Sequence, residues 1–267
     1  MKNTSSKNLL FLIRHGERAD HAGLTPKFHP YDAELTDLGK SQATQIGEKI
    51  QLYLQKNYPQ KISKIKLISS PFARTIQTSK KILNELKKNE FNIDDIIEID
   101  YFFSECRKTK DFKDPDFISF IILLNKLDLL TRDLEATKVE FRNKPEGIVE
   151  KLYEDIEDCF KRVKVGLEKM YEKEFKVFDE DKNIKKKEYN KNGNEIANNE
   201  SVNVILIVSH GEPITQLNRL LEYPEKLDSD LVKYCDSFCY DIEHCENQEF
   251  KTKYVEKLSL FDQKETL

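Results

Sequence analysis

Two histidines of this chain each follow an apolar run and precede a glycine. His15 follows the run 9–13 and has Arg14 beside it, and His210 comes shortly after the run 202–208. Short runs of branched apolar residues are typical of parallel strands that are buried on both faces. Reacting groups gather at the carboxyl ends of such strands. Because the chain has only five histidines among 267 residues, the repeat favours one shared site over two surface turns.

A third strand-like run, residues 65–69, leads into Ser70-Pro71. This pair can start a helix, because serine caps helices and proline fits their first turn. Arg74 then falls in the first turn, where unpaired N–H groups and the positive end of the helix dipole favour an anion. Arginine also matches phosphate with a planar, permanently charged guanidinium. Together with the two histidines, these residues indicate a site that handles phosphate.

These motifs resemble those of the histidine phosphatase superfamily, whose members have the phosphoglycerate mutase-like fold. The resemblance spans most of the chain. The segments that carry it are Arg14-His15-Gly16, the Leu-Thr-x-x-Gly-x-x-Gln-Ala stretch within 32–43, the Ser-x-x-x-Arg-x-x-x-Thr element within 69–78, Glu105 after the third strand, and Ser209-His210-Gly211.

The resemblance implies a role for each core residue. His15, as neutral imidazole, would attack phosphorus to form a phosphohistidine. Arg14 and Arg74 would bind the phosphoryl oxygens, and His210 would donate a hydrogen bond to one of them. Glu105 would protonate the leaving oxygen and then activate water, which asks for a carboxyl pKa raised by partial burial. The implied reaction requires no metal ion and no other cofactor.

Arg18, His21 and Gly211 are further candidates for binding the substrate. Arg18 and His21 follow the first motif within reach of its loop, and Gly211 belongs to the second motif. In mutase-like members the position of His21 is often an asparagine that bonds the phosphate. Ordinary surface side chains are the alternative interpretation of Arg18 and His21. The basic stretch 107–113 after Glu105 is either a solvated loop or an attractor for an anionic substrate.

A group of cysteines near the end of the chain invites interpretation as a zinc site. It consists of Cys235, Cys239 and Cys245, with His244 between them. The stretch 234–242 alternates like a strand, and its spacing lacks the paired Cys-x-x-Cys of structural zinc sites. We therefore expect no metal here, with Cys235 and Cys239 as small core residues on one face of a strand.

The composition is typical of a soluble enzyme. The net charge of −4 provides no basic surface for nucleic acid. The longest apolar runs, of five to seven residues, are too short to span a membrane, and the polar residues 1–8 lack the apolar stretch of a signal peptide. We expect a cytoplasmic protein without nucleic-acid or membrane partners, and its oligomeric state stays open.

The order of the patterns predicts an α/β, three-layer sandwich with a mainly parallel central sheet. One domain would span 1–267, with helices from Thr36 to about residue 58 and from about 71 to 89, and strands at 64–69 and 96–99. Residues of about 115–170 look like a helical insertion that could wall the site. The polar stretch of about 175–200 looks like a mobile loop.

Three functions are compatible with these motifs. The first is a metal-independent phosphatase for a phosphorylated small molecule or a phosphoprotein; the start of the chain most resembles the branch of ubiquitin-associated and SH3-domain-containing tyrosine phosphatases. The second is a phosphoglycerate mutase, although residues 104–108 depart from the Asn-Glu-Arg-His-Tyr-Gly stretch of cofactor-dependent mutases. The third is a regulatory protein that binds phosphate without turnover. The acid phosphatase branch is rejected, because Gly211 rather than aspartate follows His210.

Overall fold

The computed structural model describes residues 7–27, 31–59, 61–89, 91–106, 138–143, 154–184, 201–244 and 250–260. Within these residues the strands form one seven-stranded sheet of order β4-β3-β2-β5-β1-β6-β7. The strands are β1 (Lys7–Arg14), β2 (Ile62–Ser69), β3 (Ile93–Asp100), β4 (Lys138–Asn143), β5 (Val202–Ser209), β6 (Ser237–His244) and β7 (Phe250–Leu258). The first five in the sheet order pair in parallel, whereas β6 is antiparallel to both β1 and β7.

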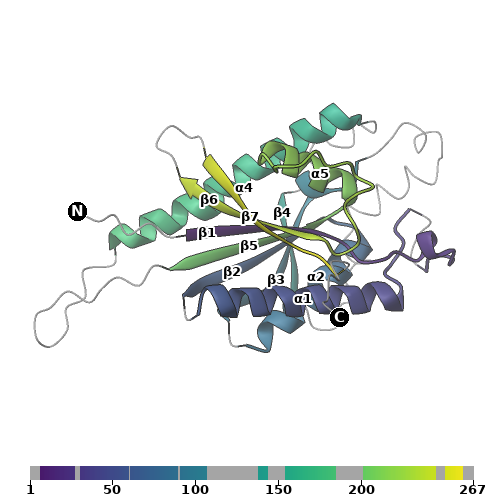
Figure 1. The fold of residues 1–267 in the computed structure, drawn as a ribbon, viewed down its shortest axis with the longest axis horizontal. Helices are drawn as coiled ribbons and strands as arrows, with labels where there is room; N and C mark the ends of the chain where they lie inside the picture. The colour runs from purple at the N-terminus through teal and green to yellow at the C-terminus, as the bar shows by residue number, and fades with distance from the viewer. Residues whose placement is uncertain are drawn as a thin grey trace, which may run out of the picture.

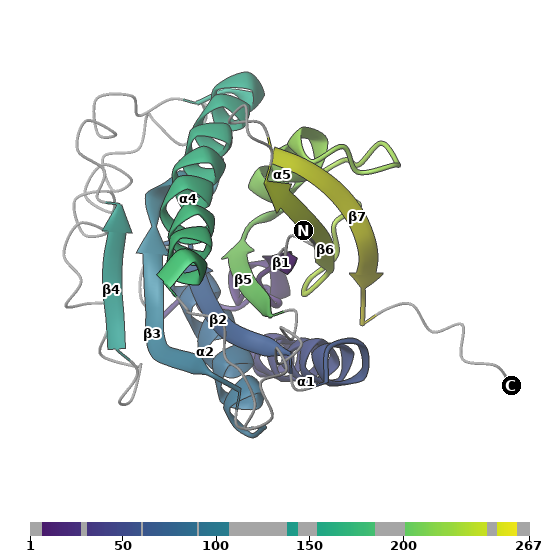
Figure 2. The same ribbon diagram turned by 90° about the vertical axis from the view of Figure 1, so that its left-hand side faces the viewer.

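Helices cover both faces of this sheet, as Figures 1 and 2 show. On one face lie α1 (Asp37–Asn57) and α2 (Ala73–Lys87), and on the other lie α4 (Ile156–Ile184) and α5 (Gly211–Leu220). Two short 3-10 helices, η1 (Asp20–Ala22) and η2 (Tyr101–Phe103), follow β1 and β3. The predicted α/β sandwich with a mainly parallel sheet is confirmed.

The sequence of β1 reflects its place in the middle of the sheet. Leu9, Phe11 and Ile13 belong to the core under α1 and α2, and Leu10 and Leu12 belong to the core on the α4 and α5 side. All five are fully buried. Because successive side chains of a strand point to opposite faces, a strand covered on both sides needs a continuous apolar run.

The two helices that precede and follow β2 begin differently. Thr36 caps α1 as predicted, since its Oγ1 accepts a hydrogen bond from Gly39 N at 2.9 Å. The expected serine cap of α2 is wrong: the helix begins at Ala73, and Ala73 N donates to Asp32 Oδ1 at 2.8 Å. A carboxylate distant in sequence thus stabilises the N-terminus of α2, which no local motif reveals.

The region expected to be helical, about 115–170, contains the strand β4, and α4 continues through Ile184 into the expected mobile loop. Both differences have local reasons. Residues 138–141 alternate polar and apolar side chains, as an edge strand does. The end of α4 contains the charged run 179–182, which has no apolar period to mark it as a helix. Residues 107–137, 144–153 and 185–200 lie outside the described part of the chain. The single-domain division stays a prediction.

Cys235 and Cys239 are buried in the same core cluster, as expected. The strand that carries Cys239 begins at Ser237, however, so Cys235 precedes it and has a left-handed backbone with a φ of 59°. The other two members of this group, Cys245 and the side chain of His244, lie outside the described residues.

None of the helices described has a stretch that is both long enough and apolar enough to cross a membrane.

Candidate active site

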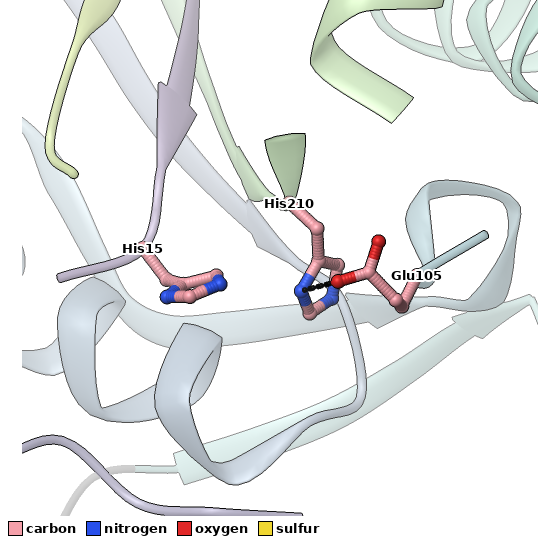
Figure 3. A group of neighbouring side chains, drawn as sticks. All are labelled: His15, Glu105 and His210. Carbon is pink, nitrogen blue, oxygen red and sulfur yellow. Dashed lines mark ion pairs between the residues drawn. The ribbon is translucent and has the colours of Figure 1, made fainter. Parts of the chain in front are cut away.

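The predicted site residues meet at the carboxyl ends of the parallel strands. The carboxyl ends of β1, β5, β2 and β3 lie there in register, with Arg14 opposite Ser209 and Ser69 opposite Val208. His15 and His210 therefore come from adjacent strands, and their ring centroids are 5.2 Å apart. Figure 3 shows these two histidines beside Glu105, which follows η2. The prediction that the motifs form one shared site is thus supported by the geometry.

His15 is held as a neutral base. Its side chain is buried, and its Nδ1 lies 2.7 Å from the carbonyl oxygen of Gly16. On the other side of the ring, Arg74 Nε donates to His15 Nε2 at 3.3 Å. Burial, reinforced by the positive charge of Arg74, lowers the pKa of His15 well below its usual value. The ring thus carries its proton on Nδ1 and keeps a lone pair on Nε2.

Arg74 lies at the centre of the site. Its Nη2 is 3.1 Å from His210 Nδ1 and 3.5 Å from Glu105 Oε2, and its side chain is only 1% exposed. Burial lowers the pKa of this arginine to about 10, so its guanidinium stays charged at neutral pH. Arg74 Nη1 is 3.8 Å from Asp32 Oδ1 and has no hydrogen-bond partner among the described residues. One donor is therefore left for a ligand.

His210 and Glu105 form a coupled pair. His210 Nε2 lies 2.7 Å from Ser70 Oγ, and His210 Nδ1 lies 3.1 Å from Glu105 Oε2, the pair dashed in Figure 3. Burial lowers the pKa of His210 to about 4. At neutral pH the ring is then neutral, donates Nδ1–H to the Glu105 carboxylate and accepts the hydroxyl hydrogen of Ser70.

The expected raised pKa of Glu105 is wrong for the site without a ligand. Burial does raise the pKa of this carboxyl, but His210 and then Arg74 outweigh burial, and the net pKa lies well below the usual range. The carboxyl is consequently ionised until another negative charge enters the site.

Arg14 presents a second incompletely paired guanidinium. Its Nη1 donates to the carbonyl oxygen of Val232, and its Cζ lies 4.5 Å from the centre of the Tyr234 ring. Arg14 Nε is buried and has no hydrogen-bond partner among the described residues. A buried N–H without an acceptor is costly. Arg14 and Arg74 together thus leave two buried donors that an anion with several oxygens would satisfy.

The three weaker candidates lie around this centre. Arg18 forms a forked ion pair with Asp20, and the exposed His21 has its Nδ1 2.7 Å from Tyr234 Oη. Gly211 is the first residue of α5, and a Cβ there would lie 3.7 Å from Arg14 Cζ. The structure thus places Gly211 against a site arginine, Arg18 in a local ion pair and His21 on an aromatic side chain.

The loop after β1 is fixed by the start of α1. Glu17 N donates to Gln42 Oε1 at 2.8 Å, and Thr36 Oγ1 donates to Glu17 Oε2 at 2.7 Å. Gly39 lies so close that an added Cβ would be 2.2 Å from Glu17 O. Through these contacts Thr36, Gly39 and Gln42 hold the loop that contains His15.

Four residues to which the sequence interpretation gave no role in the site also shape it. Thr78 Oγ1 accepts from Gly16 N at 3.1 Å and donates to Arg74 O at 2.8 Å, so it joins the two motifs. Ser70 orients His210, and both Ser70 and Thr78 stand in the Ser-x-x-x-Arg-x-x-x-Thr element that could have revealed them. Tyr234, whose ring lies 5.7 Å from that of His15, and Asp32 carry no such local signal.

Two clusters of described residues could offer ligand atoms to a metal ion: His15, Glu105 and His210, and Cys106, Glu154 and Cys159. An arginine occupies each of them. Arg74 contacts all three members of the first cluster. Arg162 binds Glu154 through two hydrogen bonds and lies 3.6 Å from Cys159 Sγ. A fixed positive charge at such distances repels a cation, so the first cluster suits an anion.

Comparison with known families agrees with this geometry. Residues 10–115, which include His15, Arg74 and Glu105, match the sequence model of the histidine phosphatase superfamily (branch 1). Over these residues the chain matches the histidine phosphatase superfamily, the family that its motifs resemble. No curated protein matches it significantly.

Solved structures show the same fold at low sequence identity. A phosphoglycerate mutase from Bacillus anthracis str. Sterne has 16% identity and a TM-score of 0.52, over 96% of this chain and 95% of that one. A mycobacterial glucosyl-3-phosphoglycerate phosphatase has 13% identity and a TM-score of 0.47, over 92% and 96%. A protein described as mycobacterial hydrolase 1 has 13% identity and a TM-score of 0.48, over 93% and 97%. The first likeness shows the phosphoglycerate mutase-like fold.

Proposed function

We propose that this protein is a metal-independent phosphomonoester phosphatase that acts through a phosphohistidine on His15. One observation carries the proposal: His15 is held neutral with its proton on Nδ1, and its Nε2 lone pair accepts a hydrogen bond from Arg74 Nε, a donor that a phosphoryl oxygen would take over. A neutral imidazole beside a guanidinium is what in-line attack on a phosphate ester requires.

Substrate binding would use the free donors of the two arginines. A phosphomonoester brings a dianion whose oxygens would accept from Arg14 Nε and Arg74 Nη1, two buried N–H groups of the site that have no partner among the described residues. Charge-assisted hydrogen bonds contribute roughly 1.5 to 3 kcal/mol each. His210 Nδ1–H would turn from Glu105 to a phosphoryl oxygen. The positive groups would then neutralise the charge that shifts onto those oxygens as the ester bond breaks.

Glu105 would supply the proton for the leaving group. The incoming dianion would take over His210 and Arg74, the two groups that hold the carboxyl pKa down most strongly. It also adds a like charge, and both changes raise the pKa of Glu105. The Nε2–P bond forms while the P–O bond to the alcohol breaks, and the alcohol oxygen receives the Glu105 proton.

The second step would return the enzyme to its starting state. The Glu105 carboxylate would take a proton from water as the water oxygen attacks phosphorus, the Nε2–P bond breaks, and inorganic phosphate leaves. The Glu105 side chain is 29% exposed, in contrast to the buried His15 and Arg74. Access of water to the acid supports hydrolysis over transfer to a second bound substrate, which a mutase protects from water.

The test is a panel of phosphate esters assayed with a chelator present. It includes p-nitrophenyl phosphate, sugar phosphates, phosphotyrosine peptides, and 3-phosphoglycerate with its bisphosphate cofactor. We expect release of free phosphate without the bisphosphate, and an acid-labile phosphoenzyme after rapid quenching. Mutase turnover that exceeds phosphate release on the same preparation would overturn the proposal.

His15→Ala should abolish this activity while the protein stays folded, because no other group can form the bond to phosphorus. His244→Ala is the matched control, since His244 lies on β6 opposite the amino-terminal end of β1, at the far edge of the sheet from the site. Substantial activity in the His15 variant would exclude His15 as nucleophile. The two substrate classes, a phosphorylated small molecule and a phosphoprotein, both stay open. The cytoplasmic location expected from the sequence stays a prediction.

A further inference from the structure

Glu105 follows a turn whose carbonyl groups are held by side chains of other elements. Arg162 Nη1 donates to Phe102 O at 2.6 Å, and Arg162 Nη2 donates to Ser104 O at 3.0 Å. Between them, Phe103 O accepts from Ser209 Oγ at 2.6 Å. Three consecutive carbonyls directly before Glu105 are therefore fixed from outside the turn, two of them by one guanidinium.

Arg162 is itself held in place. Its Nε and Nη2 bind the two oxygens of Glu154 at 2.8 Å and 2.7 Å. The side chains of Arg162 and Glu154 are only 10% and 7% exposed. A buried charge pair of this kind fixes geometry, because removing either partner leaves an unpaired charge. Each guanidinium nitrogen of Arg162 thus has a partner, either in the turn before Glu105 or in the Glu154 side chain, which lies just before α4.

A second contact brings α4 close to the same turn. Gly166 lies four residues after Arg162, so both are on one face of the helix. A Cβ on Gly166 would lie 2.4 Å from Phe102 Cβ. The absence of a side chain at this position allows the helix backbone to approach the turn closely enough for Arg162 to reach the carbonyls.

From these contacts we propose that Arg162 is a positioning residue, which sets the location of Glu105 and so the rate of proton transfer to the leaving group. The inference rests on the proposed function. In the step concerned, the P–O bond breaks, its electron pair goes to the alcohol oxygen, and that oxygen takes the Glu105 proton. Proton transfer depends steeply on the distance between donor and acceptor, and an error of about 1 Å can cost a hundredfold in rate.

Arg162→Lys tests this proposal. One ammonium cannot replace a fork that binds Phe102 O, Ser104 O and Glu154 together. With an alkyl phosphate, which needs the acid, we expect first-turnover release of the alcohol to slow at least about tenfold. With p-nitrophenyl phosphate, whose leaving group scarcely needs a proton, the change should stay within about threefold. Equal losses on both substrates, or no loss on either, would overturn the proposal.

Arg219→Lys is the matched control. Arg219 on α5 also contacts α4, since its Cζ lies 4.4 Å from the centre of the Phe160 ring and its Nη1 lies 3.4 Å from Glu157 Oε2. This arginine is exposed and contacts Phe160 and Glu157 of α4 rather than the turn before Glu105, so both substrates should react as in the wild type. A selective loss in this control would show that any change in α4 has the effect, which would contradict a special role for Arg162.

A second variant and a second readout keep the test decisive. If Arg162→Lys does not fold, Gly166→Ala should displace the turn and produce the same selective loss on the alkyl phosphate. Hydrogen exchange of the amides of Ser104 and Cys106 should be faster in Arg162→Lys than in Arg219→Lys. Exchange needs no turnover, so it judges the positioning role even if the wild type releases no phosphate and the proposed function fails. Equal exchange in the two variants would refute the inference.

Discussion

Replacing Gly39 with alanine should impair the active site from within α1. The added Cβ would lie 2.2 Å from Glu17 O, 2.9 Å from Glu17 N and 3.0 Å from Glu17 C. Ordinary contact begins near 3.4 Å, so helix and loop must separate by about 1 Å. Both sides are backbone, and neither can turn away. Because Glu17 follows His15 by two residues, the displacement would reach His15, the proposed nucleophile.

The expected magnitude follows from this shift. A misplacement of about 1 Å costs about a hundredfold in kcat/KM, which corresponds to about 2.7 kcal/mol. The free energy of unfolding should change by less, because two effects of opposite sign partly cancel. Overpacking costs about 1 to 3 kcal/mol, and alanine in a helix recovers roughly 0.5 to 1 kcal/mol relative to glycine. The variant should therefore remain folded and bind the substrate in a distorted site.

The assay compares kcat/KM for p-nitrophenyl phosphate with urea unfolding of the same preparation. Gly47→Ala is the control in the same helix. A Cβ there would lie 3.0 Å from Glu85 Cβ and 3.1 Å from Ile82 Cα on α2, so a shift of only a few tenths of an ångström is needed, against about 1 Å at Gly39. It adds the same methyl group to α1 away from the loop and should keep wild-type activity. Activity of Gly39→Ala within about threefold of the wild type would refute the reasoning, since the required shift would then have no effect on catalysis.

Two further predictions concern ionisation. Burial raises the pKa of Asp32 from 3.8 to about 6. The Asp32 carboxyl therefore binds a proton more tightly in the folded state than in the unfolded state. The contribution of this carboxyl to the free energy of unfolding falls as pH rises from about 4 to 6. Asp32→Asn should thus gain up to about 3 kcal/mol relative to the wild type between pH 4 and pH 7 in urea unfolding, and parallel pH profiles would contradict this. Glu105→Gln should slow first-turnover alcohol release from alkyl phosphates about a hundredfold or more while sparing p-nitrophenyl phosphate; equal slowing would exclude Glu105 as the acid.

Three residues that the sequence revealed share one property: they directly follow a parallel strand or lie in the first turn of the helix after it. His15 and His210 directly follow adjacent strands, and Arg74 is in the first turn of the helix after β2. A parallel sheet brings all such positions to one edge, so their meeting could be predicted without knowing the packing.

Residues that depend on tertiary contacts could not be found in this way. Asp32 reaches the start of α2 across about 40 residues, and Arg162 reaches the turn before Glu105 from α4. Tyr234 precedes the antiparallel strand β6, whose amino-terminal end lies beside the carboxyl end of the parallel strand β1. Residues just before such a strand meet the site as well, but their own sequence looks like ordinary loop.

The extent of β4 and α4 shows a different limit. The apolar period that identifies a helix reports only its buried face. A helix that continues through a run of charged residues, as α4 does at 179–182, therefore looks like a loop in the sequence. Strand β4 alternates, yet its six residues are too few to stand out between two long stretches. Periodicity therefore locates the central layers better than their margins.

The position of β1 also determines how late the site can form. Its two neighbours in the sheet are β5 and β6, which lie about 190 residues or more further along the chain. The strand that leads to His15 is therefore synthesised well before either of its hydrogen-bonded partners. Loop closure over such a distance is a slow step in folding. Until it occurs, the apolar residues of β1 lack their cover and depend on local collapse or a chaperone for protection from aggregation.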